Sequence, residues 1–328
     1  MIFSAFFYTL WQGIKNIFRN KLFSLASVAT ISACLFLFGL FYAILANFQN
    51  IVKTAEEGVC VVVFFDENIT DKRIEEIKAY ADKLGLEIYA TAANNCFASI
   101  VPEQIENELM FVREQIKVTA KLGAPVMRVF AAWRGIVFRN GIATYEVTRV
   151  PNYWGALPHE LHQSVVACLK EAVKWAEEYG VVLALQNHEP IIKDYRDMLD
   201  FVKEVDSPWL KCCFDAPCCG YVEEVQTDEY IRKATLDVGN LQTLSHANAE
   251  FEEKTDGSIG MIHYDNHMAL TNYPMFIKTL KEIGYDGYVG YEFCHMPFHN
   301  NTILGYNDYI ENQIRLAQKY FRGLIENA

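Results

Sequence analysis

The sequence predicts an α/β protein in which a parallel β-sheet forms a (β/α)8 barrel. From about residue 79, short runs rich in β-branched and aromatic residues alternate with longer amphipathic segments. This alternation is typical of a parallel sheet covered by helices. Glycines stand near the ends of four amphipathic segments, just before the next strand, at Gly85, Gly123, Gly180 and Gly284, as C-cap glycines do. The number of repeats favours a barrel over a doubly wound sheet.

Six strands and four of the helices between them are assigned in order. The strands are expected at residues 86–93, 125–132, 181–188, 210–216, 241–248 and 287–293. The helices are expected at 102–122, 159–179, 195–205 and 273–283. No glycine-rich phosphate-binding motif follows any of these strands, which makes a nucleotide-binding function a weak interpretation.

Composition excludes several classes of protein. The 328 residues are 52% hydrophobic and 21% charged, which is unlike a disordered or collagen-like chain. The net charge of −12 argues against nucleic-acid binding, which needs a basic surface. The nine cysteines are odd in number and include the neighbours Cys212-Cys213 and Cys218-Cys219. Reduced, buried thiols are favoured over a disulfide framework, and a zinc site made from these four cysteines is the alternative.

The N-terminal part predicts a membrane anchor. Its most apolar segment, residues 22–46, exceeds the ~20 residues that a helix needs to cross a bilayer. The flanking charges are basic before the segment and acidic after it: Lys15, Arg19 and Lys21, then Glu56 and Glu57. This bias predicts a single-pass helix with its N-terminus inside the cell, and therefore location at the cell membrane. A cleaved signal peptide and a buried helix of a soluble core are the alternatives.

Two stretches of this part are GIKNIFRNKLFSLASVATISACLFLFGLFYAI and FQNIVKTAEEGVCVVVFFDENITDKRIEEI. They resemble the start of an FtsX-family cell-division permease, over about residues 1–77. The resemblance implies a cytoplasmic leader, one transmembrane helix and the first strand–helix unit of an extracellular domain. The later membrane helices of that family have no counterpart in this sequence, so only the anchor is carried over.

Polar side chains gather at the carboxyl ends of the predicted strands, where a barrel keeps its active site. In chain order they are Asn94 and Asn95, Trp133 and Arg134, Gln186 to Glu189, Asp215, His246 with Asn248 and Glu250, and Glu292 with His295. One polar strand end is unremarkable, but six at equivalent positions indicate a binding or catalytic site.

The segments LEIYATAANNCF, LGAPVMRVFAAWRG, YGVVLALQNHEP, WLKCCFDAP, LSHANAEFEE and GYDGYVGYEF resemble the sugar phosphate isomerase/epimerase family, whose barrel is similar to xylose isomerase. The resemblance covers about residues 78–328. It implies a divalent metal, Mn²⁺ ahead of Mg²⁺, Zn²⁺ or Co²⁺, held by Asp215, His246 and Glu292. The first of the family's four ligands, a glutamate at the end of strand five, is Gln186 here. The barrel part alone would be cytoplasmic.

The exchange of glutamate for Gln186 bears on the reaction. An amide oxygen can bind Mg²⁺ or Mn²⁺, but it brings no charge and cannot accept a proton. The two-base epimerisation of the family is therefore in doubt. A one-base route remains, in which His188, placed by an extended strand on the same face as Gln186, removes a proton next to a carbonyl. Glu292 would act as the acid partner or only as a ligand.

This chemistry fits a sugar isomerase or epimerase-type enzyme acting on a small carbohydrate. A metal-dependent lyase that eliminates from 3-keto-glycosides is the second enzyme class, and a non-catalytic membrane-anchored chain is the alternative to both. Five residues are candidates for substrate contact: Asn95, Trp133, Arg134, Glu250 and His263. Core packing, a salt bridge or a solvated loop is the structural alternative for each of them.

The two resemblances together predict two domains, residues 1–77 and 78–328. The family's first two strands are absent from the second domain, so the barrel is expected to be incomplete, with family strands three to eight. The apolar run at residues 59–65, VCVVVFF, would add a foreign strand. The meeting point near Ile77 fits either a genuine fusion or a recombined or misassembled reading frame.

Overall fold

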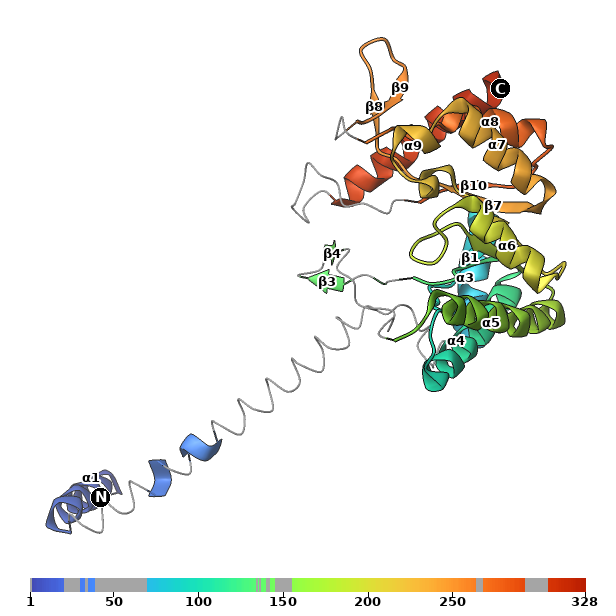
Figure 1. Cartoon of the computed structure of the whole chain (residues 1–328). Helices are drawn as coiled ribbons and strands as arrows, with labels where there is room; N and C mark the ends of the chain where they lie inside the picture. Colours follow the sequence, from blue (N-terminus) through green and yellow to red (C-terminus); the bar gives the residue numbers. More distant parts are fainter. Residues whose placement is uncertain are drawn as a thin grey trace. The chain divides into compact units, whose positions relative to one another are not determined.

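The computed structural model describes residues 2–20, 30–32, 35–38, 70–133, 135, 137–139, 142–144, 155–263, 268–292 and 306–328 (Figure 1). The chain divides into two units, Met1–Val62 and Val63–Ala328. The described residues of the first unit are helical and include α1 (Ile2–Arg19). Within the described ranges, no helix is long and apolar enough to cross a membrane. Most of the predicted segment 22–46, and all of the predicted strand 59–65, lie outside these ranges.

The second unit is built on a parallel sheet. In its described part, six strands pair in the order β1-β2-β5-β6-β7-β10. They are β1 (Ala90–Ala92), β2 (Val126–Val129), β5 (Val182–Gln186), β6 (Leu210–Cys213), β7 (Gln242–Ala247) and β10 (Val289–Tyr291). All six predicted strands are confirmed, in the predicted order. Each is shorter than predicted, and the predicted ranges extend into the loops that carry the polar residues.

Helices follow the strands and pack on one another around the sheet. They are α3 (Asp71–Leu84), α4 (Pro102–Leu122), α5 (Pro158–Tyr179), α6 (Tyr195–Val205), α7 (Asp228–Val238), α8 (Tyr273–Glu282) and α9 (Tyr306–Asn327). The four predicted helices are confirmed to within one residue at each end. Helices α3 to α6 pack in sequence along one side, and α7 to α9 pack together near β7 and β10 (Figure 1). Parallel strands with covering helices make this unit a half-barrel of the TIM type.

Left-handed glycines end the helices as the sequence predicted. Gly85, Gly123 and Gly180 are the C-caps of α3, α4 and α5, each with φ between 69° and 80°. Gly284 follows α8 with φ 72°. A residue with a Cβ is strained in this conformation, so these glycines fix the points at which the chain turns back into the sheet.

Smaller elements connect the main ones. Two antiparallel hairpins are formed by β3 (Val137–Arg139) with β4 (Ile142–Thr144) and by β8 (Phe251–Glu253) with β9 (Ile259–Met261). Three single turns of 3₁₀ helix are η1 (Ala216–Cys219), η2 (Glu223–Val225) and η3 (Gly239–Leu241). Helix α9 is fixed to the second hairpin because the Gln313 side chain exchanges two hydrogen bonds with the Phe251 backbone, at 2.7 and 3.0 Å.

The two edges of the sheet meet where β1 and β10 begin. The rings of Tyr89, just before β1, and Tyr288, just before β10, lie 4.3 Å apart between centroids. Tyr288 Oη also donates to Glu87 Oε2 at 2.6 Å. The edge strands therefore approach one another through side chains at this end, which covers part of the seam that an incomplete barrel would leave open.

The pairing of β6 with β7 is irregular at one point. Cys212 pairs with Gln242 and Cys213 with Leu244, so Thr243 has no residue opposite it. Such a bulge bends a strand and changes the direction in which the next side chains point. Tyr89 Oη donates to the Thr243 carbonyl at 2.8 Å, which gives the carbonyl of the bulge a partner.

The two faces of the sheet carry different layers. Side chains that point toward the helices, such as Leu183, Leu185 and Cys212, belong to the large apolar core. A small apolar cluster fills the inner face: Val126, Ala184, Cys213 and Leu244. Because side chains alternate along a strand, the residues two positions further on also face inward. They are polar in all four strands: Arg128, Gln186, Asp215 and His246.

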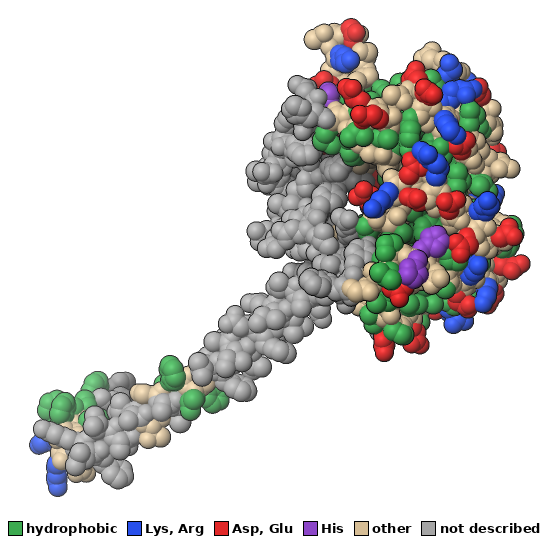
Figure 2. Space-filling view, viewed as in Figure 1, with side chains coloured by type: hydrophobic (Ala, Val, Ile, Leu, Met, Phe, Trp, Pro, Cys, Tyr) green, Lys and Arg blue, Asp and Glu red, His purple; other side chains and the backbone are tan. Residues whose placement is uncertain are grey.

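The outer surface of the second unit is mixed in charge. Acidic and basic side chains are interspersed over the face drawn in Figure 2. Together with the net charge of −12, this gives no support to a nucleic-acid-binding surface.

Candidate active site

A layer of polar side chains lies inside the half-barrel at the carboxyl ends of its strands. Asp215 has no exposed surface, Gln186 is 2% exposed and Arg128 is 4% exposed. The His246 side chain is 16% exposed. Burying charged groups is unfavourable unless they are paired or bind a ligand, so the contacts within this layer decide what it can do.

Asp215 is the centre of the layer and accepts hydrogen bonds on both carboxylate oxygens. Oδ1 accepts from the His246 backbone N–H at 2.6 Å and from Cys213 Sγ at 3.5 Å. Oδ2 accepts from Gln186 Nε2 and lies 3.1 Å from His246 Nδ1. Asn187 holds the Asp215 backbone through two further hydrogen bonds, of 2.8 and 3.1 Å. The carboxylate is therefore fixed in position by three neighbouring strands.

His246 is held against this carboxylate. Burial by itself lowers the pKa of His246, but the charge of Asp215 and the hydrogen bond to it outweigh burial and raise the pKa above its usual value. Glu292 also contributes to the rise, which places its charge near the imidazole. At β10, Gly290 pairs with His246, and a Cβ on Gly290 would lie 3.5 Å from the His246 ring. Gly290 therefore packs directly beside the His246 ring.

Cys213 completes a compact group of potential ligands. Its sulfur lies 3.4 Å from His246 Nδ1 and 3.5 Å from Asp215 Oδ1. One ligand atom from each of Cys213, Asp215 and His246 lies within 4.8 Å of the others. The sequence did not single out Cys213 for this place, although its position two residues before Asp215 on the same strand was a usable signal.

The amide of Gln186 is only partly satisfied. Its Nε2 donates to Asp215, while its buried Oε1 has no hydrogen-bond partner within the described structure. A buried acceptor without a protein partner is uncommon, and a cation or a water can satisfy it. The donor set of sulfur, nitrogen and oxygen next to this acceptor suits a divalent metal. The residues present therefore fit the kind of ion that the sequence implied.

Glu292, the fourth predicted ligand, lies one residue after β10, with its backbone N–H bonded to Ala247 O at 2.9 Å. Its carboxylate acts on the pKa of His246 but does not belong to the 4.8 Å group of Cys213, Asp215 and His246. The structure thus brings Gln186, Asp215 and His246 into contact and leaves Glu292 beside them.

The predicted placement of His188 on an extended strand is wrong. Strand β5 ends at Gln186, and the His188 N–H donates to Gln186 O at 2.8 Å, which makes a tight turn. His188 Nδ1 lies 2.6 Å from Glu189 O, and its ring meets Phe130 edge-on with centroids 4.9 Å apart. A turn after β5 directs the imidazole toward the end of β2, and its role as a base stays a prediction.

Phe130 and Trp133, which follow β2, form an aromatic wall, and Asn95, which follows β1, binds the backbone of Phe130. Phe130 is buried, its ring is parallel to Trp133 at 6.0 Å, and the Arg128 guanidinium lies 3.9 Å from its centroid. Asn95 uses its amide to bind the Phe130 backbone, donating to O at 2.7 Å and accepting from N at 2.9 Å. Its predicted contact with substrate is untested, and Arg134 lies outside the described residues.

The last two substrate candidates lie near the β8–β9 hairpin. Glu250 is buried and accepts a hydrogen bond from Tyr309 of α9. His263 is exposed, and its Nε2 lies 2.6 Å from the Met268 carbonyl. Glu250 is therefore held by the fold, and His263 is held within its own loop.

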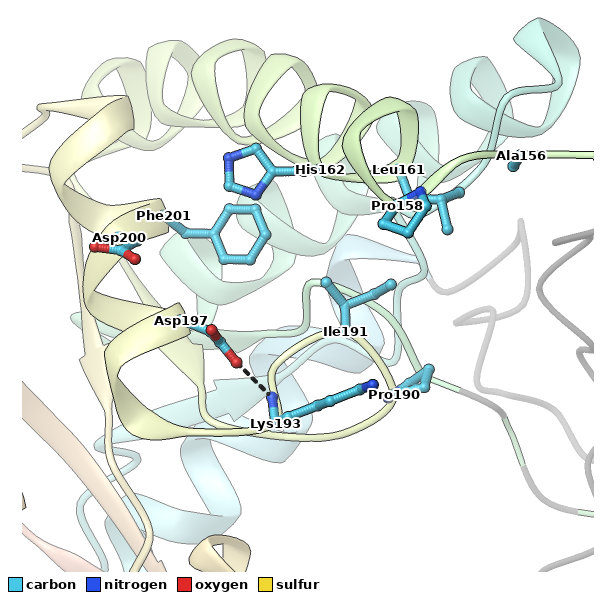
Figure 3. Close-up of a pocket in the computed structure, with 10 residues that line it drawn as sticks. All are labelled: Ala156, Pro158, Leu161, His162, Pro190, Ile191, Lys193, Asp197, Asp200 and Phe201. Carbon is cyan, nitrogen blue, oxygen red and sulfur yellow. Dashed lines mark hydrogen bonds between the residues drawn. The ribbon is translucent and has the colours of Figure 1, made fainter.

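A cavity of about 610 Å³ opens elsewhere in the second unit (Figure 3). It lies between the start of α5, the loop after β5 and α6, with His162, Ile191 and Phe201 among its walls. Asp197 Oδ2 accepts from the Lys193 N–H at 2.9 Å at its edge. None of the residues around Asp215 lines it, so the cavity and the metal-ligand group are separate features.

The family described as xylose isomerase-like TIM barrel matches residues 51–320. The chain belongs to this family. The match confirms the barrel resemblance predicted for residues 78–328 and begins before that range. Nothing in the comparisons supports the predicted resemblance of residues 1–77 to a cell-division permease, and the predicted domain boundary stays a prediction.

Solved structures of other proteins share the fold at low identity. The E. coli 3-keto-D-glucoside 4-epimerase YcjR, in its apo form, superposes with a TM-score of 0.54 and 18% identity, over 75% of this chain and 85% of that one. The protein IolI, solved with a bound zinc atom, superposes with a TM-score of 0.55 and 17% identity, over 81% and 86%. Identities this low establish the fold alone.

A curated relative is MJ1311 of Methanocaldococcus jannaschii, described as uncharacterized. It is 27% identical over 165 residues, which are 44% of this chain and 47% of that protein. The matching region therefore spans about half the length of this relative.

Proposed function

We propose that this protein is a divalent-metal-dependent enzyme of the sugar isomerase and epimerase type, which removes a proton next to a carbonyl of a small carbohydrate. The observation that carries the proposal is the buried Gln186 Oε1 without a partner among the described residues, beside the fixed carboxylate of Asp215 and the imidazole of His246. Sugar epimerases among the proteins of the same fold support the substrate class.

Asp215 and His246 would hold the cation, and Gln186, through its unpartnered Oε1, and Glu292, whose charge acts on His246, are the candidates for further ligands. Mn²⁺, Mg²⁺, Zn²⁺ and Co²⁺ all accept such ligands. When bound, the cation supplies a Lewis acid that stabilises negative charge on a carbonyl oxygen.

His188 is the proposed base. Because Glu189 O can only accept, His188 Nδ1 carries the hydrogen of that contact, and neutral His188 keeps its lone pair on Nε2. The contact also fixes the ring relative to Phe130. Trp133, which is partly exposed and whose ring is parallel to that of the buried Phe130, offers an apolar surface on which one face of a sugar ring can lie.

A second candidate is a lyase that eliminates from 3-keto-glycosides. Gln186 favours it, because an amide cannot accept the proton that a two-base epimerisation passes to the opposite face. Elimination needs one base and one acid, and His188 with Glu292 would supply both. The 3-keto-D-glucoside 4-epimerase of the same fold supports a 3-keto sugar as the substrate class to test beside free ketohexoses.

Proton exchange with solvent tests the proposal even while the product is unidentified. The metal-loaded protein is incubated in D₂O with free ketohexoses and with a 3-keto-glucoside, and deuterium uptake next to the carbonyl is followed by NMR. We expect uptake from one of these substrates and a fall of about 100-fold or more in His188→Gln. The exposed hairpin variant Asp256→Asn should match wild type. The absence of exchange with every substrate would overturn the proposal.

A further inference from the structure

We propose that Cys213 is a thiolate ligand of the metal, and that the site therefore selects a thiophilic ion such as Zn²⁺ over Mn²⁺ or Mg²⁺. The inference rests on the proposed function only in taking the group around Asp215 as the metal site. It replaces the sequence expectation of Mn²⁺.

The direction of Cys213 is set by its strand. Cys212 and Cys213 are neighbours on β6, and both are fully buried. Cys212 packs in the core beneath the helices, whereas Cys213 belongs to the inner cluster with Ala184 and Leu244. Cys213 also pairs with Gln186 across the sheet. The sulfur of Cys213 therefore points to the same side as the polar layer, and the sulfur of Cys212 points away from it.

The ligand atoms of the group lie close enough together for one small ion. From the usual Zn–S, Zn–N and Zn–O bond lengths, two ligand atoms on a tetrahedral ion lie about 3.4 to 3.6 Å apart. Cys213 Sγ lies 3.4 Å from His246 Nδ1 and 3.5 Å from Asp215 Oδ1, which agrees with that spacing, while the other carboxylate oxygen, Oδ2, lies 3.1 Å from His246 Nδ1. One ligand atom from each of the three residues lies within 4.8 Å of the others.

The charge of the site supports the same assignment. Gln186 is neutral where the resemblance implied a glutamate, so the group lacks one negative charge beside Asp215. A thiolate at Cys213 would restore that charge at the residue paired with Gln186. Gln186 Oε1, buried and without a partner among the described residues, is then available as an oxygen ligand or as the acceptor for a metal-bound water.

Binding of the metal by Cys213 releases one proton. The Cys213 S–H bond breaks as the sulfur–metal bond forms, and the proton leaves to solvent. Soft thiolate ligands favour Zn²⁺ and Co²⁺, while sites made only of carboxylate, carbonyl and water suit Mg²⁺ and Mn²⁺. The preference for metal is therefore a consequence of one side chain.

Cobalt spectroscopy of the full chain tests the inference independently of activity. We expect Co²⁺ bound to the metal-free protein to show a sulfur-to-cobalt charge-transfer band in the near ultraviolet. Cys213→Ser should lose the band, and Cys212→Ser, the matched control on the same strand, should keep it. By competition with a chromophoric chelator, Cys213→Ser should bind Zn²⁺ at least about 10-fold more weakly, with little change in Mn²⁺ affinity.

The outcomes separate this inference from the proposed function. Cobalt binding without the charge-transfer band, or with a band that survives Cys213→Ser, would overturn the thiolate assignment and leave the metal site standing. No binding of Co²⁺, Zn²⁺ or Mn²⁺ would remove both. If Cys213→Ser does not fold, a variant in which every cysteine except Cys213 is changed to serine decides the matter, because loss of its band would overturn the assignment and retention would support it.

Discussion

Asn95, just after β1, and Gln186, at the end of β5, are buried amides at the same edge of one sheet, with 0% and 2% of their surface exposed. Asn95 uses its nitrogen and its oxygen to bind the Phe130 backbone. Gln186 uses only its nitrogen, on the carboxylate of Asp215, and its oxygen has no partner in the described part of the chain. Asn95 therefore joins the ends of β1 and β2 through both of its amide atoms. Gln186 has the same functional group, but its amide oxygen is left without a hydrogen-bond partner among the described residues.

Other buried amides follow the pattern of Asn95. Asn187, Gln242 and Gln313 each bind the backbone of one distant residue through both amide atoms, at Asp215, Phe214 and Phe251 respectively. A closed pair of this kind satisfies all the polar atoms involved and holds the fold. An amide that departs from this pattern next to a buried charge indicates a place kept for a ligand.

The largest expected effect is a loss of metal affinity at the group around Gln186 and Asp215. Asp215→Ala should abolish high-affinity metal binding, because it removes the carboxylate on which Gln186, Cys213 and His246 converge. The loss should exceed the ~10- to 100-fold that follows removal of an outer hydrogen-bond partner. Titration calorimetry of the metal-free chain measures it, with exposed Asp256→Ala as control. Equal Zn²⁺ affinity in Asp215→Ala and wild type would contradict the assignment.

Asn95→Ala should lower the stability of the fold and leave the affinity for metal unchanged. The variant leaves the Phe130 N–H and C=O without their partner in a buried place, at about 1 to 3 kcal/mol for each group. Urea unfolding should show that loss of stability, and Zn²⁺ affinity should stay within error of wild type. A stable Asn95→Ala protein with weakened metal or sugar binding would instead assign Asn95 to the site.

Gln186→Glu converts the open amide into a second carboxylate beside Asp215. With metal we expect affinity to rise by about 10-fold or more, since a charged ligand replaces a neutral one. Without metal, one of the two carboxyls should keep a proton, with a pKa raised above the unfolded value of about 4.3.

A pKa raised in the folded state makes the metal-free Gln186→Glu protein less stable as the pH rises through that pKa. Unfolding at about pH 5 and about pH 8 should therefore show the greater loss relative to wild type at pH 8. An unchanged Zn²⁺ affinity would mean that residue 186 does not contact the metal.

The smallest effect on stability is expected at Asp194, whose carboxylate already has hydrogen-bond partners. Asp194 caps α6, and although burial raises its pKa, hydrogen bonds from the Arg196 N–H and from Tyr230 outweigh burial and lower it. Its contribution is present above the unfolded pKa and is lost as the pH falls through the folded value. Asp194→Ala should lower stability by about 1 kcal/mol at neutral pH, with the difference shrinking in acid. A difference that grows in acid would contradict this.

Periodicity was sufficient for the framework of the second unit. The six strands, their order and four helices follow from apolar runs and C-cap glycines. The strand ends were the weak point, because the chain leaves the sheet earlier than the apolar runs end. His188 is an example. It was predicted to lie on the same face as Gln186 because β5 was expected to continue to residue 188, but the chain turns after Gln186.

The site was predictable in part for a similar reason. Asp215, His246 and Gln186 were found from their places at strand ends, and the structure brings them together. Cys213 read as a core residue because a cysteine inside an apolar strand is usually one. Its contact with His246 depends on the alignment of β6 against β7, which no single strand's sequence contains.

That alignment includes the unpaired Thr243 of β7. The strand therefore carries one residue more than regular pairing would use, and His246 lies three residues after it. Deletion of Thr243 would leave every chemical group of the site in the sequence and would let β7 pair regularly with β6. The bend that the bulge gives β7 would be lost, and with it the direction in which the following side chains, His246 among them, point. The position of the imidazole beside Asp215 should therefore depend on the length of β7 as well as on its side chains.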